Sequence, residues 1–156
     1  MTILLRQILV PTDFSDRSEV ALTYGVALTR QFDASLHLLH VVESITVAAD
    51  PQPWQWGSRE EIDHAIASHA WDDLHRVIPA EDQRSVRVQF ALEWGMPFVE
   101  IIRYAKAHAI DLIAMGTHGR SAVKHLVMGS VAENVVRTAP CPVLTVRHPE
   151  HEFVFP

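Results

Sequence analysis

Short apolar runs alternate along this chain with amphipathic helical patterns, and this alternation constrains the fold more than any other feature. The runs expected to form strands cover residues 7–11, 35–42, 86–93, 111–116 and 141–146. The helical patterns cover residues 15–32, 58–78, 98–109 and 130–138. Strands that alternate with helices imply right-handed crossover connections. We therefore predict an α/β domain with a parallel sheet and helices on both faces.

The two longest helical patterns begin with capping signals. Asp16-Arg-Ser-Glu19 and Ser58-Arg-Glu-Glu61 each match a capping box, in which a polar side chain and a glutamate bond free backbone N–H groups. Pro79 ends the second pattern because proline cannot continue a helix. The first helix is predicted to bury a stripe that consists of Ala21, Gly25, Leu28 and Phe32.

Size and charge restrict the class of protein. The 156 residues are 48% hydrophobic and are expected to form one domain over 1–156, with a tail at 147–156. The net charge of −6 argues against a protein whose main task is to bind nucleic acid or anionic lipid through a basic face. Cys141 is the only cysteine, so no internal disulfide can form, which suits a reducing cytosol.

The apolar runs are too short for export or membrane insertion. None approaches the roughly 18 apolar residues of a membrane span. Arg6 interrupts the first run too early for the core of a signal peptide. We therefore expect a soluble, cytoplasmic protein.

A glycine-containing loop follows the fourth predicted strand. The run from Asp111 ends at Gly116, the loop contains Gly119 and Gly129, and Ser130 opens the last helix. Glycines let backbone N–H groups approach a ligand, and a helix N-terminus adds partial positive charge. The loop also contains four potential cations, His118, Arg120, Lys124 and His125. A solvated basic turn would contain the same residues, but glycines placed between a strand and a helix favour a phosphate-binding loop.

Three segments are expected to meet at the carboxyl edge of the sheet, where parallel α/β sheets bind their ligands. They are Pro11-Thr12-Asp13, His40 to Val42 and Met115 to Gly119. Asp13 could accept hydrogen bonds from a ribose or an adenine edge, or it could cap the first helix beside Ser15 and Asp16. We favour the ligand role because Ser15 and Asp16 can already cap that helix.

The histidines do not match a metal site. His64 and His75 lie too far apart on one helix, about 16 Å at 1.5 Å per residue. His37 and His40 are expected on opposite faces of a strand. Asp13 has no neighbouring carboxylates suited to complete a cage for a hard cation, so any Mg²⁺ would be held mainly by phosphate oxygens. We predict no metal ligands from the protein itself.

Several of these segments together resemble the universal stress protein family. Gly116-x2-Gly119-x9-Gly129-Ser130 is similar to the family's nucleotide-binding signature, and residues 8–15 resemble its opening strand. Residues 38–41, 129–135 and 140–146 resemble three further family segments. The resemblance implies a Rossmann-like three-layer sandwich with a five-stranded parallel sheet in the order 3-2-1-4-5. It also implies ATP binding and a dimer formed through the last strand.

The resemblance implies roles for individual residues. Asp13 and the Val41 backbone would hold the adenosine end, and Ser130 would present the start of the last helix to the phosphates. The full set expected at the nucleotide is Pro11, Thr12, Asp13, Val41, Met115, Gly116, His118, Gly119, Arg120, Gly129, Ser130 and Val131. Ala132 departs from the family pattern because it offers no hydroxyl to a phosphate or a metal.

The resemblance favours an ATP-binding regulatory or stress-response protein that acts as a homodimer. A slow ATPase and a dimeric interaction module with a vestigial pocket stay open as alternatives, as do AMP and cyclic nucleotides beside ATP. The sequence contains no G-x4-G-K-[ST] loop and no acidic cluster for two metals, so it identifies no catalytic residue. The last strand presents Val143, Thr145 and Arg147 on one face, and its edge is expected to pair with a second copy.

Overall fold

The computed structural model describes residues 3–43, 58–117 and 130–147. The strands are β1 (Gln7–Pro11), β2 (Ser35–Val42), β3 (Arg87–Trp94), β4 (Leu112–Gly116) and β5 (Val143–Val146). The helices are α1 (Asp16–Phe32), α2 (Arg59–Val77), α3 (Ala80–Ser85), α4 (Pro97–Ala107) and α5 (Ser130–Thr138). Strands and helices alternate as predicted, except that α2 and α3 follow one another between β2 and β3.

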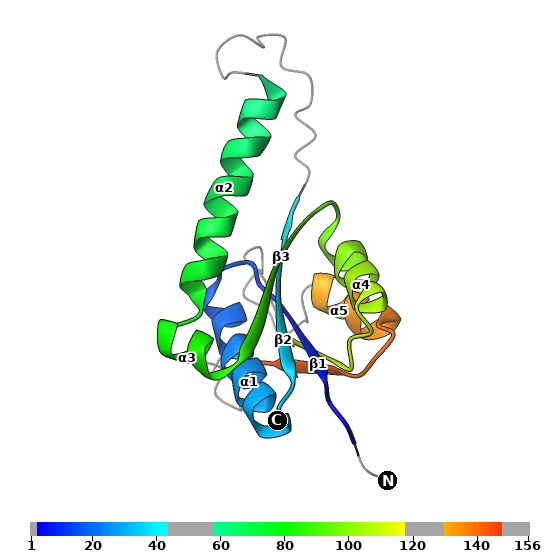
Figure 1. Cartoon of the computed structure of the whole chain (residues 1–156). Helices are drawn as coiled ribbons and strands as arrows, with labels where there is room; N and C mark the ends of the chain where they lie inside the picture. Colours follow the sequence, from blue (N-terminus) through cyan, green and yellow to red (C-terminus); the bar gives the residue numbers. More distant parts are fainter. Residues whose placement is uncertain (1–2, 44–57, 118–129, 148–156) are drawn as a thin grey trace, which may run out of the picture.

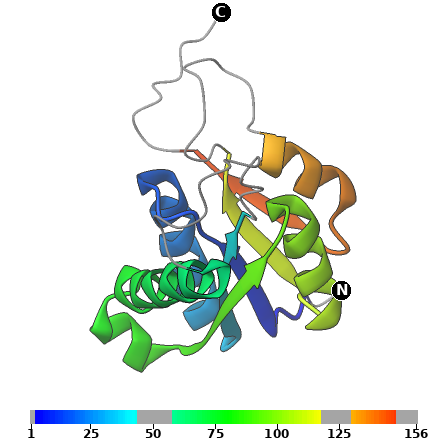
Figure 2. The same ribbon diagram turned by 90° about the horizontal axis from the view of Figure 1, so that it is seen from above.

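The five strands form one parallel sheet in the order β3-β2-β1-β4-β5. Helices α1, α2 and α3 cover one face and α4 and α5 cover the other, which gives three layers (Figure 1 and Figure 2). The predicted architecture and strand order are thus confirmed. The chain adds β2 and β3 on one side of β1, then crosses to add β4 and β5 on the other.

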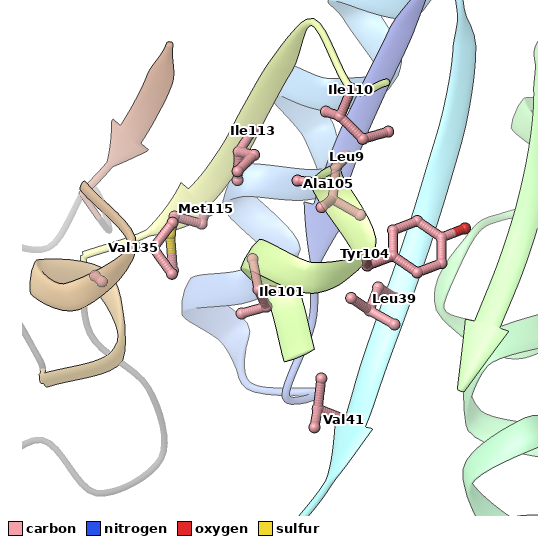
Figure 3. Close-up of a cluster of buried hydrophobic side chains, with 11 residues drawn as sticks. Leu9, Leu39, Val41, Ile101, Tyr104, Ala105, Ile110, Ile113, Met115 and Val135 are labelled. Atoms are coloured by element: carbon pink, nitrogen blue, oxygen red, sulfur yellow. The ribbon is translucent and has the colours of Figure 1, made fainter. Parts of the chain in front are cut away.

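Each face of the sheet has its own hydrophobic core, because successive side chains of a strand point to opposite faces. The side chains beneath α1 and α2 are those of Ile8, Val10, Leu36 and Leu38. Leu9, Leu39 and Val41 pack beneath α4 and α5, together with residues of those helices (Figure 3). β1 and β2 are therefore buried on both faces, as their nearly continuous apolar sequences predict.

The start of α1 differs by one residue from the predicted cap. Ser15, not Asp16, is the N-cap, and its Oγ accepts a hydrogen bond from the Ser18 N–H. Asp13 holds Ser15 in the N-cap position, because its carboxylate accepts hydrogen bonds from both the N–H and the hydroxyl of Ser15. The predicted capping box at α2 is confirmed, because Ser58 and Glu61 bond each other's backbone N–H groups.

The predicted buried stripe of α1 is correct in its first half and wrong at its end. Ala21 and Gly25 are buried, and a Cβ on Gly25 would lie only 2.4 Å from a methyl carbon of Val10. Glycine therefore lets α1 lie directly on β1. Phe32 is 41% exposed, because the helix ends there and Thr29 makes its last buried contact.

The main further differences from the sequence prediction concern α3 and the start of β5, and the other predicted boundaries agree to within two residues. Helix α3 was not predicted, because none of its side chains is buried and it therefore has no apolar stripe. β5 begins at Val143, two residues later than expected. Pro142 precedes it with no N–H of its own, although its carbonyl accepts the Ile113 N–H at 3.0 Å.

Candidate functional site

The candidate site lies at the carboxyl edge of the sheet, where β1 parts from β4. β1 pairs with β2 from Gln7 to Pro11, but with β4 only at Ile8 and Leu9. The first crossover leaves β1 toward β2, and β4 lies on the other side of β1. Such a switch point opens a crevice beyond the strand ends. The sequence predicts ligand-binding residues at this place.

The turn that follows β1 is fixed by its own side chains. The Thr12 N–H donates to the Leu39 carbonyl at 2.8 Å, and Thr12 is buried. Its hydroxyl oxygen accepts the Phe14 N–H at 3.0 Å and lies 3.1 Å from the Ser18 hydroxyl. Phe14 has a φ of 61°, a left-handed conformation that non-glycine residues rarely adopt. Several contacts therefore hold a strained turn between β1 and α1.

Asp13 lies in the middle of this turn and is half-buried. One carboxylate oxygen, Oδ1, accepts the Ser15 N–H at 3.1 Å and the Ser15 hydroxyl at 2.5 Å. Asp13 thus supports the N-cap, which was the alternative to a ligand role, and the two roles can use different lone pairs of the carboxylate. The pairing of Pro11 with Leu39 brings Asp13 to the level of Val41 on the neighbouring strand.

The backbone of Val41 faces the same crevice. The Gly95 N–H donates to the Val42 carbonyl, so Val42 directs its backbone groups toward β3. The Thr12 N–H donates to the Leu39 carbonyl, so Leu39 directs its groups toward β1. By this alternation Val41 directs its N–H and C=O toward the side of β1, at a level where that strand has already ended. This direction is the one that its predicted role requires.

The end of β4 forms another wall. Met115 is buried in the core beneath α4 and α5, and Gly116 is half-buried at the last position of the strand. Thr117 follows, and its N–H donates to the Val146 carbonyl at 3.0 Å. β4 is therefore held by β5 to its last residue, while it separates from β1.

A cavity of about 510 Å³ lies between the starts of α4 and α5 and the ends of β2 and β3. Ser130 and Val131, which the sequence places in the site, contribute to its lining. Ser130 is the first residue of α5, and its carbonyl accepts a hydrogen bond from the Asn134 amide at 2.9 Å. The other lining residues are Glu43, Gly95, Met96, Pro97 and Phe98.

Sequence reasoning missed Glu43, the Met96 to Phe98 segment and Asn134. The sequence pattern predicted the start of a helix at residue 98 and indicated no part for this segment in the site, although the carboxyl end of β3 must reach the same edge as that of β2. Asn134 lies four residues after Ser130, so helical spacing alone places both on one face of α5. His40 was also omitted from the predicted set, although its segment was included.

The rest of the predicted nucleotide-binding set lies outside the described residues. These residues are His118, Gly119, Arg120 and Gly129. Lys124, His125, Trp54 and Trp56 lie there as well. The described part of the predicted set therefore consists of residues 11–13, Val41, Met115, Gly116 and the first two residues of α5.

A second polar cluster lies near the amino end of the sheet. Buried His37 has its Nε2 2.7 Å from the Gln7 amide oxygen and its Nδ1 2.9 Å from the Tyr104 hydroxyl. The amide oxygen can only accept, so Nε2 carries a proton and the Tyr104 hydroxyl donates to Nδ1. Burial, together with nearby His108, lowers the pKa of His37 below its usual 6.5. This neutral histidine lies on the face of β2 opposite to His40, as predicted.

The described residues form neither a metal-binding cluster nor a membrane-spanning helix. No group of three histidine, cysteine, aspartate or glutamate side chains there could hold a metal ion. No helix in those ranges is long and apolar enough to cross a membrane.

Comparison with known proteins identifies the family. The model of the universal stress protein family matches residues 5–147. Universal stress protein MJ0531 of Methanocaldococcus jannaschii is 32% identical over 149 residues, which cover 96% of this chain and 86% of that protein. The solved structure of MJ0577 from the same organism is 27% identical, with a TM-score of 0.80 and coverage of 94% of this chain and 98% of the other.

A more distant structure is a universal stress protein of Archaeoglobus fulgidus in complex with dAMP. It is 19% identical, has a TM-score of 0.59, and the match covers 92% of this chain and 98% of that one. At this identity the likeness concerns the fold alone. The family match and the relative at 32% identity agree with the fold and with the sequence segments described above. This chain belongs to the universal stress protein family.

Proposed function

We propose that this protein binds ATP at the carboxyl edge of its sheet and acts as a nucleotide-dependent regulatory or stress-response protein in the cytoplasm. The observation that carries the proposal is the convergence of Asp13 and the Val41 backbone at one level of the crevice, where β1 has ended. A carboxylate can accept the donors of a ribose or an adenine amino group. A backbone N–H and C=O pair can read the acceptor and donor of an adenine edge.

The start of α5 supports a phosphate site beside this adenosine site. Ser130 offers a hydroxyl and a backbone N–H at the positive end of the helix dipole. The cavity of about 510 Å³ next to Ser130 has the size of a small-molecule pocket. The residues present therefore fit an adenine nucleotide, with its phosphates directed toward α5. The loop at 117–129 would complete the phosphate contacts through its predicted glycines and cations.

A relative supports the choice of adenine. The Archaeoglobus fulgidus universal stress protein was solved with dAMP, which shares the adenine base with ATP. The described residues contain no cluster that could hold a metal ion. As the sequence around Asp13 predicts, we propose that any Mg²⁺ is held mainly by the phosphate oxygens. AMP and cyclic nucleotides remain the competing ligands of the same class.

Slow ATP hydrolysis is the second candidate activity of the same site. No base for hydrolysis is identified among the residues that the structure describes, and the lining of the cavity offers Glu43 as its only carboxylate there. A general base must reach the attacking water within hydrogen-bond distance. We therefore propose binding as the primary function.

Chromatography of bound nucleotide tests this proposal. The protein is purified, denatured, and the released compounds are identified, while calorimetry measures the affinity of the empty protein for ATP, AMP and cAMP. We expect ATP to be released or to bind most tightly. ADP that accumulates with time would establish hydrolysis. Absence of bound nucleotide together with absence of binding would leave the interaction module with a vestigial pocket.

We also propose a homodimer through β5. The Ile113 N–H donates to the Pro142 carbonyl and the Thr117 N–H to the Val146 carbonyl, so the alternate residues Val143 and Thr145 direct their backbone groups away from β4, toward the outer edge of the sheet. β5 is the last strand of the sheet order. Such an edge can pair with the same edge of a second copy.

Thr145→Pro tests this interface because it removes one outward N–H and leaves the hydrogen bonds to β4 intact. Sedimentation should show a dimer for the wild type and for Thr145→Val, and mainly monomer for Thr145→Pro. A wild type that sediments as a monomer at tens of micromolar, roughly where weak interfaces still associate, would contradict the proposal.

A further inference from the structure

One imidazole connects β2 to the turn that follows β1, on the proposed adenosine side of the site. His40 lies on β2 directly before Val41, and its side chain is on the face of α1. Its Nδ1 lies 2.8 Å from the Thr12 carbonyl oxygen. A carbonyl oxygen can only accept, so Nδ1 carries the proton and donates it. His40 thereby holds the residue that precedes Asp13.

The same imidazole contacts the residue that follows Asp13. The ring centroids of Phe14 and His40 are 4.4 Å apart, and the planes are tilted by 34°. Phe14 is the residue in the left-handed conformation, with a φ of 61°. A strained backbone of this kind persists only where its surroundings determine it. The ring contact with Phe14 and the hydrogen bond to Thr12 therefore help to hold this conformation.

We propose that His40 is a positioning residue of the nucleotide site. By holding Thr12 and Phe14, it fixes the turn from both sides of Asp13 and sets the direction of the Asp13 carboxylate. It also belongs to the strand that presents the Val41 backbone, so it fixes the distance between the two adenosine contacts. This inference rests on the proposed function, since the ligand that benefits is the adenine nucleotide.

The hydrogen bond from His40 Nδ1 to the Thr12 carbonyl should not depend on the charge of the imidazole. Neutral imidazole with the proton on Nδ1 and the doubly protonated imidazolium both donate from Nδ1. The Thr12 contact is therefore preserved in either charge state of His40. His37 differs, because its Nδ1 accepts a hydrogen bond from the Tyr104 hydroxyl, and protonation would remove that acceptor.

Substitutions at His40 separate the hydrogen bond from the ring contact. His40→Asn places an amide N–H close to the position of Nδ1, whereas His40→Phe keeps a ring and loses the donor. We expect His40→Phe and His40→Ala to weaken ATP binding roughly tenfold, as the loss of one well-placed hydrogen bond would do. His40→Asn should recover most of the affinity. Equal losses in His40→Asn and His40→Phe would overturn the proposal.

A double-mutant cycle with Asp13→Ala distinguishes positioning from general stability. If His40 acts through Asp13, His40→Phe should cost no further affinity once Asp13 is alanine. Additive losses in ATP affinity, measured by calorimetry on folded variants, would show that His40 does not act through Asp13.

Hydrogen exchange of the ligand-free protein tests the effect of His40 on the turn without any nucleotide, and therefore separately from the proposed function. The Phe14 and Ser15 amides, which bond within the turn, should exchange faster in His40→Phe and remain protected in His40→Asn. If this pattern appears and no nucleotide binds the wild type, the proposed function fails and the control of the turn by His40 stands. Unchanged exchange in both variants would refute the positioning role.

Discussion

The two ends of the sheet differ: the amino end holds well-bonded polar groups, and the carboxyl end holds a strained turn and a cavity. At the amino end, the Asp111 carboxylate accepts the Arg6 and Gln7 N–H groups at 2.7 and 2.9 Å, and His37 has partners for both ring nitrogens. At the carboxyl end, the backbone is left-handed at Phe14, and a cavity lies beside the starts of α4 and α5. The buried polar bonds thus lie at the amino end and the proposed nucleotide site lies at the carboxyl end, so substitutions at the two ends should affect stability and ATP binding separately.

The largest expected effect comes from breaking the buried cluster at the amino end. His37→Phe leaves the Tyr104 hydroxyl and the Gln7 amide without their partner, which should lower the free energy of unfolding by about 3 kcal/mol. ATP affinity of the folded variant should stay within roughly twofold. Chemical denaturation and calorimetry measure the two quantities. His64→Phe is the control, since this histidine is exposed and its substitution should change stability by less than about 0.5 kcal/mol.

A smaller effect on stability is expected at Gly95, which lies at the carboxyl end and needs a backbone conformation suited to glycine. Gly95 has a φ of 148°, and a Cβ there would lie 2.8 Å from Glu100 Oε1. Gly95→Ala should therefore lower the free energy of unfolding by roughly 1–2 kcal/mol. Met96→Ala, at an exposed neighbouring position, should have little effect. Equal stability of Gly95→Ala and wild type would show that this backbone conformation is not required.

The pH dependence of the free energy of unfolding should also reveal the buried His37 at the amino end. The pKa of His37 is lowered in the folded protein by burial and by His108, so the unfolded chain binds more protons just below pH 6.5. Stability should therefore fall as the pH drops through 6.5, with a contribution of at most about 1.4 kcal/mol per pH unit. His37→Gln should remove this contribution. Denaturation curves at pH 7.5 and 5.5 whose difference is the same in both proteins would contradict the assignment.

Most of the fold could be predicted from the sequence because its signals are local. The apolar runs at 7–11 and 35–42 match β1 and β2, and the Ser58 capping box starts α2 as expected. The strand order followed from the family resemblance. Helix α3 could not be predicted from burial, and the choice of Ser15 over Asp16 as N-cap depends on a hydrogen bond to Asp13.

The candidate site was predictable in its location and less so in its construction. Parallel topology alone places Asp13 and Val41 at one edge. The left-handed Phe14 and the bond from His40 to Thr12 depend on tertiary contacts that no local pattern contains. Glu43 and Asn134 enter the lining of the cavity only once the starts of α4 and α5 are placed side by side.

The most direct measurement compares two aspartates, one at each end of the sheet. ATP affinity is measured by calorimetry, and the free energy of unfolding by urea denaturation, for wild type, Asp13→Ala and Asp111→Ala. We expect Asp13→Ala to weaken ATP binding at least roughly tenfold, and Asp111→Ala to retain the affinity and lose about 2 kcal/mol of stability. Wild-type affinity in folded Asp13→Ala would contradict the proposed site.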